Sequence, residues 1–250
     1  MIPAYNEADE LPATLKAIQE AMAMVTLAGE CIVVDNNSTD GTSEIALANG
    51  ADRVVYEPFN QIARARNAGA AASTSQYLVF IDADTRIEAK LLIEALRHLE
   101  SNCCVGGGSV LHFDGEISFI GHFLASIWEL VSKLTQIAAG SFIFCRRDAY
   151  DAIGGYDEAL YASEEIRFSR QIKRWGKKRG LKFRILDLAP VVTSSRKLQW
   201  YSGIRLLGWA SLMIFMPLAV RSRTLCGFWY NRPTKDFDSC ISNEHSKRLN

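Results

Sequence analysis

The sequence lacks the features by which several broad classes of protein are recognised. Lys+Arg and Asp+Glu number 28 each, so no global charge favours nucleic acid or another polyanion as a partner. No basic region followed by an apolar core opens the chain, so we expect no signal peptide and take the cytoplasm as the default location. The apolar content of 48% over 250 residues is ample for a folded core.

Cysteine, histidine and glycine are present without the spacing of a known metal or cofactor motif. The six cysteines contain no C-x-x-C pair, and three of them fall in apolar runs, as in a reduced intracellular protein. The four histidines have no zinc spacing. Gly106, Gly107 and Gly108 lack the G-x-G-x-x-G spacing, so they predict close packing or a β-bulge.

Strand-like and helix-like segments alternate along the chain. Helices are predicted over 11–25, 42–48, 61–72, 88–100, 117–131 and 163–175, and strands over 31–34, 53–56, 77–81, 103–113, 141–145, 183–188 and 191–193. Ser163 is the candidate N-cap of the last helix. Alternation with short connections predicts an α/β fold with a mostly parallel sheet flanked by helices, and ligands collect at the carboxyl ends of such strands.

The segment 204–220 carries one charge, Arg205, and is too short for a transmembrane helix, which needs about 20 apolar residues. Three interpretations stay open for it. It packs as a helix on the catalytic domain, it lies on a membrane surface with Arg221 and Arg223 at its flank, or it forms an oligomer contact. The polar tail 233–250 is expected to be mobile.

Two strand ends carry carboxylates. Asp35 follows the strand 31–34, and Asp82 and Asp84 follow the strand 77–81 one residue apart. Two carboxylates so close repel each other unless a cation or hydrogen-bond donors lie between them. Oxygen ligands of this kind suit Mg²⁺ or Mn²⁺, but an Asx turn would use the same residues. The residues alone leave both interpretations open.

Taken in order, six segments resemble family 2 glycosyltransferases with the GT-A fold. They are I-P-A-Y-N-E-A (2–8), V-V-D-N-N-S-T-D-G-T (33–42), A-R-N-A-G (65–69), F-I-D-A-D-T (80–85), G-G-Y-D-E (154–158) and S-E-E-I-R-F-S-R (163–170). The resemblance implies a GT-A catalytic domain over 1–198 with a Rossmann-like mixed, mostly parallel sheet. Its nucleotide-sugar half covers about 1–110 and its acceptor half about 111–198, followed by a C-terminal apolar helical segment (199–232).

The resemblance also implies a function. A sugar from a UDP- or GDP-linked donor would be transferred, with inversion, to a hydroxyl of a saccharide or lipid-linked acceptor, with Mg²⁺ or Mn²⁺ as cofactor. The donor would be bound by Pro3, Ala4, Tyr5, Glu7, Asp35, Asn37, Arg66, Asp82, Ala83 and Asp84, and the acceptor or diphosphate loop would contain Gly140, Ser141, Glu164 and Arg196. No nucleic acid is expected, and membrane contact through 204–220 would place the protein at the inner face of the membrane.

Individual roles follow from the same resemblance. Asp84 would hold the metal, while Asp82 would contact the ribose or a metal-bound water. Glu165, where the family commonly has Asp, would be the general base, because adjacent helical residues diverge by about 100° and only one of Glu164 and Glu165 can face the reaction. Arg66 would reach the nucleotide with its guanidinium.

Two other functions differ in how well they fit the sequence. A non-catalytic nucleotide-sugar-binding scaffold derived from such an enzyme is compatible with Glu at position 165 and with a first strand that begins at Met1. A nucleotidyltransferase would need a glycine-rich, basic loop after the first strand, where this chain has P-A-Y-N-E-A-D-E. Transfer of a single sugar is expected instead of polymer extension.

Overall fold

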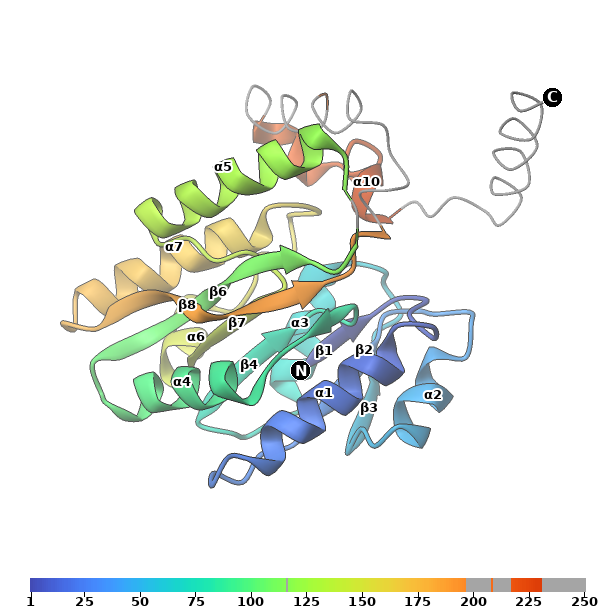
Figure 1. Ribbon diagram of the computed structural model, residues 1–250, viewed down its shortest axis with the longest axis horizontal. Coiled ribbons are helices and arrows are strands. Elements are labelled where there is room, and N and C mark those ends of the chain that lie inside the picture. Colours follow the sequence, from blue (N-terminus) through green and yellow to red (C-terminus); the bar gives the residue numbers. More distant parts are fainter. Residues whose placement is uncertain (116, 197–207, 209–216, 231–250) are drawn as a thin grey trace.

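The computed structural model describes residues 1–115, 117–196, 208 and 217–230, in which helices and strands alternate as in an α/β fold (Figure 1). The strands are β1 (Ile2–Ala4), β2 (Ile32–Asp35), β3 (Arg53–Tyr56), β4 (Tyr77–Ile81), β5 (Thr85–Arg86), β6 (Cys104–Phe113), β7 (Phe142–Arg146) and β8 (Lys182–Thr193). The helices are α1 (Leu11–Ala23), α2 (Thr42–Ala48), α3 (Ile62–Ala71), α4 (Ala89–Glu100), α5 (Phe119–Thr135), α6 (Arg147–Ile153), α7 (Glu164–Lys177), the 3-10 helix η1 (Pro217–Arg221) and α10 (Gly227–Tyr230).

The first half of the chain forms a parallel sheet. Its strands lie in the order β1, β2, β3, with Ile2 opposite Val33. The sheet continues to β4 through Met1, whose ammonium group donates to the carbonyl of Val79 at 2.8 Å and whose carbonyl accepts from the amide of Ile81 at 3.1 Å. The carboxyl ends of β1, β2 and β4 therefore lie at one edge.

The second half of the sheet is mixed. Its strands lie in the order β4, β7, β6, β8, β5; β6 and β8 are parallel, and the other three pairs are antiparallel. The predicted predominance of parallel strands is thus found in the first half of the chain. Because β7 runs against β4, the residues before β7 lie beside those after β4, and the amide of Asp82 donates to the carbonyl of Ser141 at 3.2 Å.

Helices cover both faces of the sheet and enclose two main apolar clusters. On one face α1 and α4, in front of the strands in Figure 1, bury Leu15 and Leu91 against Phe142. On the other face α3, α6 and α7 enclose Phe80, whose ring lies 6.4 Å from that of Phe168. Burial of these side chains supplies most of the driving force for folding.

The glycines of β6 confirm the expectation of close packing. The pairing of β6 with β8 is irregular between Cys104 and Gly106, as in a bulge. A Cβ atom at Gly107 would lie 2.0 Å from the carbonyl oxygen of Arg184, and one at Gly108 would lie 2.4 Å from the Cβ atom of Ala138. Only glycine lets the neighbouring backbones approach this closely.

Three local predictions differ from the structure. Ser163 does not cap α7 with its side chain, because its backbone is left-handed (φ 59°) instead of extended. Helix α5 begins and ends later than predicted, and Ser118 caps it by accepting from the amide of Gly121 at 3.1 Å. The strands predicted at 183–188 and 191–193 form one strand, β8, because its irregular pairing with β6 accommodates the residues between them.

The carboxyl-terminal region is described only in part. Of the apolar segment 204–220, the structure describes residues 208 and 217–220, so the predicted helix and the tail 233–250 otherwise lie outside the described residues. Residues 217–230 pack on the domain, where Cys226 and Tyr230 contact Ala162 and the amide of Tyr161 donates to the carbonyl of Val220 at 2.7 Å. Among the described residues, no helix has the length and hydropathy needed to cross a bilayer.

Candidate active site

The residues predicted to bind a nucleotide begin at the carboxyl end of β2. Asp35 is buried, and its carboxylate accepts from the amide of Ser38 at 2.8 Å and from the hydroxyl of Ser43. Asn37 has a left-handed backbone (φ 68°) and accepts from the hydroxyl of Tyr56 at 2.9 Å. These contacts fix the turn after β2, and a contact between Asp35 and a nucleotide stays a prediction.

The end of β1 supplies a second group of predicted residues. Pro3 and Ala4 belong to β1, and Tyr5 follows them with a half-buried side chain. Glu7 is buried and accepts from Nη2 of Arg196 at 2.7 Å. Burial works against the charge on Arg196, but the Glu7 carboxylate outweighs it and raises the pKa of the guanidinium. The structure therefore brings Arg196 of the predicted acceptor or diphosphate loop to the segment that follows β1.

The two aspartates after β4 point in different directions. Oδ1 of Asp82 accepts from Nη2 of Arg66 at 3.0 Å, whereas Oδ1 of the buried Asp84 accepts from the Thr193 hydroxyl at 3.3 Å. Between them, the carbonyl of Ala83 accepts from the hydroxyl of Thr14 at 2.8 Å. The strand tip is thus held by α1, α3 and the end of β8.

The aspartate pair fits a divalent cation as part of a site. Within residues 1–115, 117–196, 208 and 217–230, no group of three or more His, Cys, Asp and Glu side chains could enclose a metal ion. Mg²⁺ is nevertheless commonly bound through one or two carboxylates, with substrate phosphates filling other positions. Asp82, with 30% of its side chain exposed, and Asp84 supply two such carboxylates.

Arg66 joins this strand tip to α7. Its guanidinium donates to Oε1 of Glu164 at 2.7 Å, to Asp82 and to the carbonyl of Gly140 at 3.2 Å. The face of the guanidinium lies 5.1 Å from the ring centroid of Tyr156, and only 2% of the side chain is exposed. The predicted contact between Arg66 and the nucleotide stays a prediction, since the structure places this cation among carboxylates.

Glu165 differs from its neighbour Glu164 in its contacts. Glu164 is buried against Arg66, whereas Glu165 is half-buried and has no side-chain partner among the described residues. Burial and the adjacent Glu164 carboxylate raise the pKa of Glu165 to about 8, although Arg66 acts in the opposite direction. A carboxyl group with such a pKa can exchange a proton near neutral pH, as a general base must.

Sequence reasoning missed several residues that hold the site. Oδ1 of Asn67 accepts from the amide of Tyr156 at 2.9 Å and from the Tyr150 hydroxyl at 2.7 Å. These hydrogen bonds position the ring of Tyr156 against Arg66. Asn67 lies in the motif A-R-N-A-G and Tyr156 in the motif G-G-Y-D-E, so these motifs could have identified both residues. Thr193 donates a hydrogen bond to Asp84, and the pairing of β8 that brings it there cannot be read from the local sequence pattern.

Comparison with known proteins agrees with this geometry. The sequence model described as "Glycosyl transferase family 2" matches residues 1–154. An uncharacterized glycosyltransferase of Mycobacterium tuberculosis is 37% identical over 100 residues, which are 40% of this chain and 42% of that protein. The chain thus aligns with less than half of the length of this relative.

Two solved structures show a similar fold. Glucosyl-3-phosphoglycerate synthase from Mycobacterium tuberculosis, in complex with Mn²⁺, UDP and glucosyl-3-phosphoglycerate, has a TM-score of 0.60 at 20% identity, over 94% of this chain and 80% of that chain. A mannosyltransferase from Pyrobaculum calidifontis, in complex with GDP-Man and Mn²⁺, has a TM-score of 0.60 at 15% identity, over 100% and 79% of the two chains. The architecture is therefore the GT-A fold. Since the family model covers more than half of the 250 residues, the chain belongs to glycosyl transferase family 2.

Proposed function

We propose that this protein is a metal-dependent, inverting glycosyltransferase that transfers one sugar from a UDP- or GDP-linked donor to an acceptor hydroxyl. The observation that carries the proposal is the bridge formed by Arg66 between Asp82 and Glu164, beside Glu165. One buried guanidinium thereby gathers the strand-tip carboxylates and the start of α7 at the edge where ligands bind in α/β sheets.

The donor would lie across the carboxyl ends of β1, β2 and β4. Asp35 would accept hydrogen bonds from the base or the ribose, and Tyr5 would form the wall beside the ring. The side chain of Asp35 is already oriented by Ser38 and Ser43, so little side-chain entropy would be lost on binding. Asp82 would contact the ribose or a metal-bound water.

Asp84 and Asp82 would hold Mg²⁺ or Mn²⁺. When bound, the cation supplies positive charge against the negative charge that grows on the departing diphosphate. Thr193 restrains one oxygen of Asp84, and Arg66 restrains one oxygen of Asp82, so the chain fixes both carboxylates before the donor arrives. The complexes of the two structural neighbours with Mn²⁺ and UDP or GDP-Man support this choice of cofactor and donors.

Glu165 would act as the general base. Its carboxylate would take the proton from the acceptor hydroxyl while that oxygen forms a bond to the anomeric carbon. The bond from the anomeric carbon to the diphosphate oxygen would break on the opposite face, and its electron pair would leave with the diphosphate. Attack from the face opposite the leaving group inverts the configuration at the anomeric carbon.

The acceptor and the location belong to the same proposal. A saccharide or lipid-linked hydroxyl would enter on the side of Gly140 and Ser141, which lie next to Asp82. The described cysteines, Cys31, Cys103, Cys104, Cys145 and Cys226, are all free thiols, as expected at a cytoplasmic location. Contact of 204–220 with the inner face of the membrane is likewise proposed.

Turnover of UDP- and GDP-sugars with Mn²⁺ tests the proposal. The Glu165→Gln variant should retain donor binding and lose transfer by about 100-fold or more, because it lacks the base. The Asp84→Ala variant should lose both transfer and metal-dependent donor binding. Glu20→Gln, an exposed carboxylate change on α1, is the matched control and should behave as the unmodified protein. Transfer by Glu165→Gln at the unmodified rate would overturn the assignment of the base.

One observation favours a second function. With a pKa of about 8, Glu165 is mostly protonated at neutral pH in the protein without ligands, and a protonated carboxyl cannot accept the proton. In a non-catalytic nucleotide-sugar-binding scaffold, Glu165 would stay protonated at neutral pH with the donor bound as well. Metal-dependent binding of UDP or GDP with no hydrolysis or transfer between pH 6 and pH 9 would support the scaffold.

A further inference from the structure

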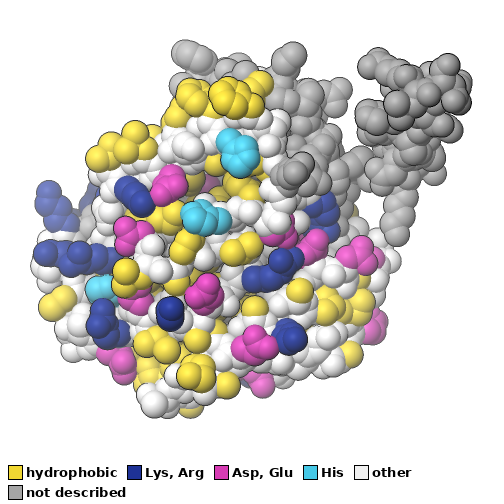
Figure 2. Space-filling model, in the orientation of Figure 1, with side chains coloured by type: hydrophobic (Ala, Val, Ile, Leu, Met, Phe, Trp, Pro, Cys, Tyr) yellow, Lys and Arg dark blue, Asp and Glu magenta, His cyan; other side chains and the backbone are white. Residues whose placement is uncertain are grey.

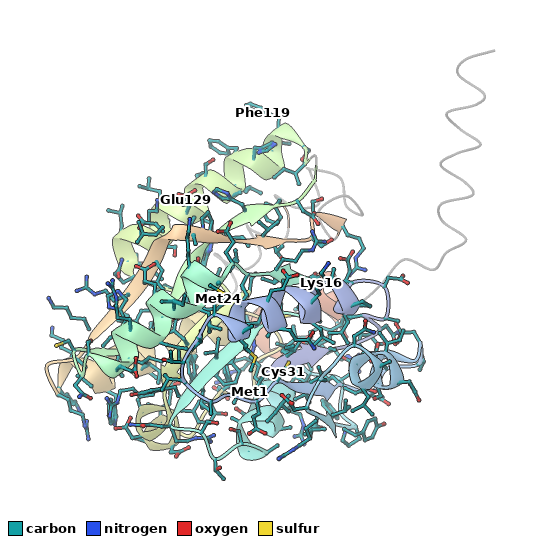
Figure 3. The ribbon with its side chains drawn as sticks, turned by 60° about the horizontal axis from the view of Figure 1, so that its bottom comes forward. Met1, Lys16, Met24, Cys31, Phe119 and Glu129 are labelled. Atoms are coloured by element: carbon teal, nitrogen blue, oxygen red, sulfur yellow. The ribbon has the colours of Figure 1, made fainter. Side chains whose placement is uncertain are left out.

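Helix α5 carries an apolar stripe that nothing in the described residues covers. Its members are Phe119, Phe123, Ile127, Leu130, Val131 and Leu134, and all six are exposed. At about 100° per residue they fall within roughly a third of the helix circumference and extend along its whole length. Phe119 and Leu134, at the two ends, expose 86% and 75% of their surface. Figure 3 shows Phe119 at the outer limit of the molecule, directed away from the sheet.

The fold does not need this stripe for its own packing. Helix α5 rests on β6 through its other face, where Ala125, Trp128 and Ser132 border Val110. Only Gly121 and Ser132 of the helix are fully buried. The stripe therefore exposes a contiguous row of large apolar side chains, which in soluble proteins marks an interaction surface.

A cluster of three cations lies at the carboxyl end of α5. Lys173, Arg174 and Lys177 of α7 line a shallow hollow together with Gln136. Nζ of Lys173 donates to the carbonyl of Thr135, the last residue of α5, which places the cluster at the end of the stripe. Within the part of the chain that the structure describes, none of the three forms an ion pair.

The two features occupy adjoining regions of one side of the molecule. In Figure 2, Lys and Arg side chains gather where α7 ends and β8 begins, and hydrophobic side chains follow the top of the molecule over α5. The formal net charge of the chain is zero, so the cluster is a local concentration of charge and not part of a generally basic surface. A helix with an exposed apolar face and nearby cations is the form of a membrane-surface contact.

We propose that the apolar stripe of α5 and the three-cation cluster form one docking surface for a membrane that contains anionic lipid headgroups. The stripe enters the boundary between headgroups and acyl chains, and the cluster binds the phosphates of the headgroups. Charge complementarity selects this occupant, because a purely apolar partner would leave the three cations without anionic partners. The surface is distinct from the segment 204–220 and independent of the transferase activity, since its residues lie outside the site around Arg66.

Vesicle sedimentation of the full chain, without any nucleotide sugar, tests the proposal. Binding to phosphatidylcholine vesicles with 30% phosphatidylglycerol should exceed binding to pure phosphatidylcholine by about tenfold and should weaken at high salt. The double variant Phe119→Ser/Leu134→Ser should lose about tenfold or more of its binding to both vesicles. The double variant Arg174→Gln/Lys177→Gln should lose about tenfold on anionic vesicles and little on neutral ones.

Matched controls separate docking from folding. Ile93→Ser removes an exposed apolar side chain from α4, and Lys16→Gln removes an exposed cation from α1; both should bind as the unmodified protein. All variants should unfold at the unmodified temperature, since the altered side chains are exposed. Unchanged vesicle binding by the α5 variant would overturn the proposal. So would a change of the α5 variant from dimer to monomer in analytical ultracentrifugation, which would assign the stripe to a second copy.

Discussion

Arg66 is the side chain on which the arrangement of the site depends most. It is the largest fully buried side chain of the described residues, and its ion pairs with Asp82 and Glu164 span α3, the tip of β4 and the start of α7. Burial alone would lower its pKa, but the surrounding carboxylates outweigh burial and raise the pKa above the ordinary value. The cation therefore stays charged throughout the pH range in which the protein folds.

Replacement of Arg66 by Met should destabilise the fold by about 3–5 kcal/mol, because it leaves Asp82 and Glu164 without their cation. Urea unfolding measures the loss. Arg64→Met, two residues earlier, is the control: its side chain is 38% exposed and pairs with Glu57 and Glu158 at the surface, so the change should cost at most about 1 kcal/mol. Equal urea midpoints for the two variants would show that the buried ion pairs of Arg66 stabilise the fold no more than the exposed ion pairs of Arg64.

Glu165 should make the reaction dependent on pH. Because burial and Glu164 raise its pKa to about 8, kcat/KM should rise about tenfold from pH 6 to pH 7 and level off above pH 8. The same shift affects stability in the opposite direction. The folded-state pKa lies above the ordinary 4.5, so the contribution of this group to stability is full below pH 4.5 and is lost as the pH rises through about 8.

The neighbouring carboxylate provides a control for the pH profile. Glu164→Gln removes one of the negative charges that raise the pKa of Glu165, while its amide oxygen can still accept from Arg66. The rising limb of kcat/KM should therefore move to lower pH. A limb that stays in place in Glu164→Gln, but disappears in Glu165→Gln, would show that burial alone sets the pKa.

Among the elements, β6 has the least tolerance for a side chain. Gly107→Ala would place a methyl group 2.0 Å from the carbonyl oxygen of Arg184 and 2.6 Å from Cζ of Phe144. Backbone in β8 must move to relieve this contact, so we expect a loss of about 3 kcal/mol in urea unfolding. Gly29→Ala is the control, since its nearest neighbour, Cε of Met22, is at 3.4 Å. If Gly107→Ala and Gly29→Ala unfold at the same urea concentration, β6 and β8 are not packed as described.

The elements also show what the sequence can predict. Local pattern located β4 and the carboxylates that follow it, because a run of strand formers ending in two aspartates is readable within nine residues. It could not place Ser141 beside Asp82, since that depends on β7 running antiparallel to β4. It also misjudged Ser163, whose residue type permits a side-chain cap that its left-handed backbone precludes. Residues brought in by strand pairing were accessible only through family motifs.

On the scale of the whole molecule, the two ends of the described catalytic region meet at the site. Arg196 and Glu7 are separated by 189 positions, yet their side chains lie 2.7 Å apart. A double-mutant cycle with Glu7→Gln and Arg196→Gln should give a coupling energy of about 1–3 kcal/mol in urea unfolding, because the Glu7 side chain is only 6% exposed. The control cycle on Lys16 and Glu20, which are 79% and 69% exposed, should give about 0.5 kcal/mol or less. Equal coupling energies would show that the Glu7–Arg196 contact does not hold the ends together.

Binding of metal and nucleotide should stabilise the whole molecule. UDP at 100 times its Kd in excess Mn²⁺ should add about 2.7 kcal/mol to the free energy of unfolding, if both bind only the folded protein. Chelation by EDTA should remove the metal-dependent part of this gain, which thermal unfolding records as a fall in Tm. With UDP present, Asp84→Asn should unfold at the same temperature with and without Mn²⁺, since it lacks a carboxylate for the cation. The control Asp187→Asn changes an exposed residue of β8 and should keep the full increase in Tm from Mn²⁺. If UDP raised the free energy of unfolding equally in EDTA and in Mn²⁺, nucleotide binding would not depend on a metal held by Asp82 and Asp84.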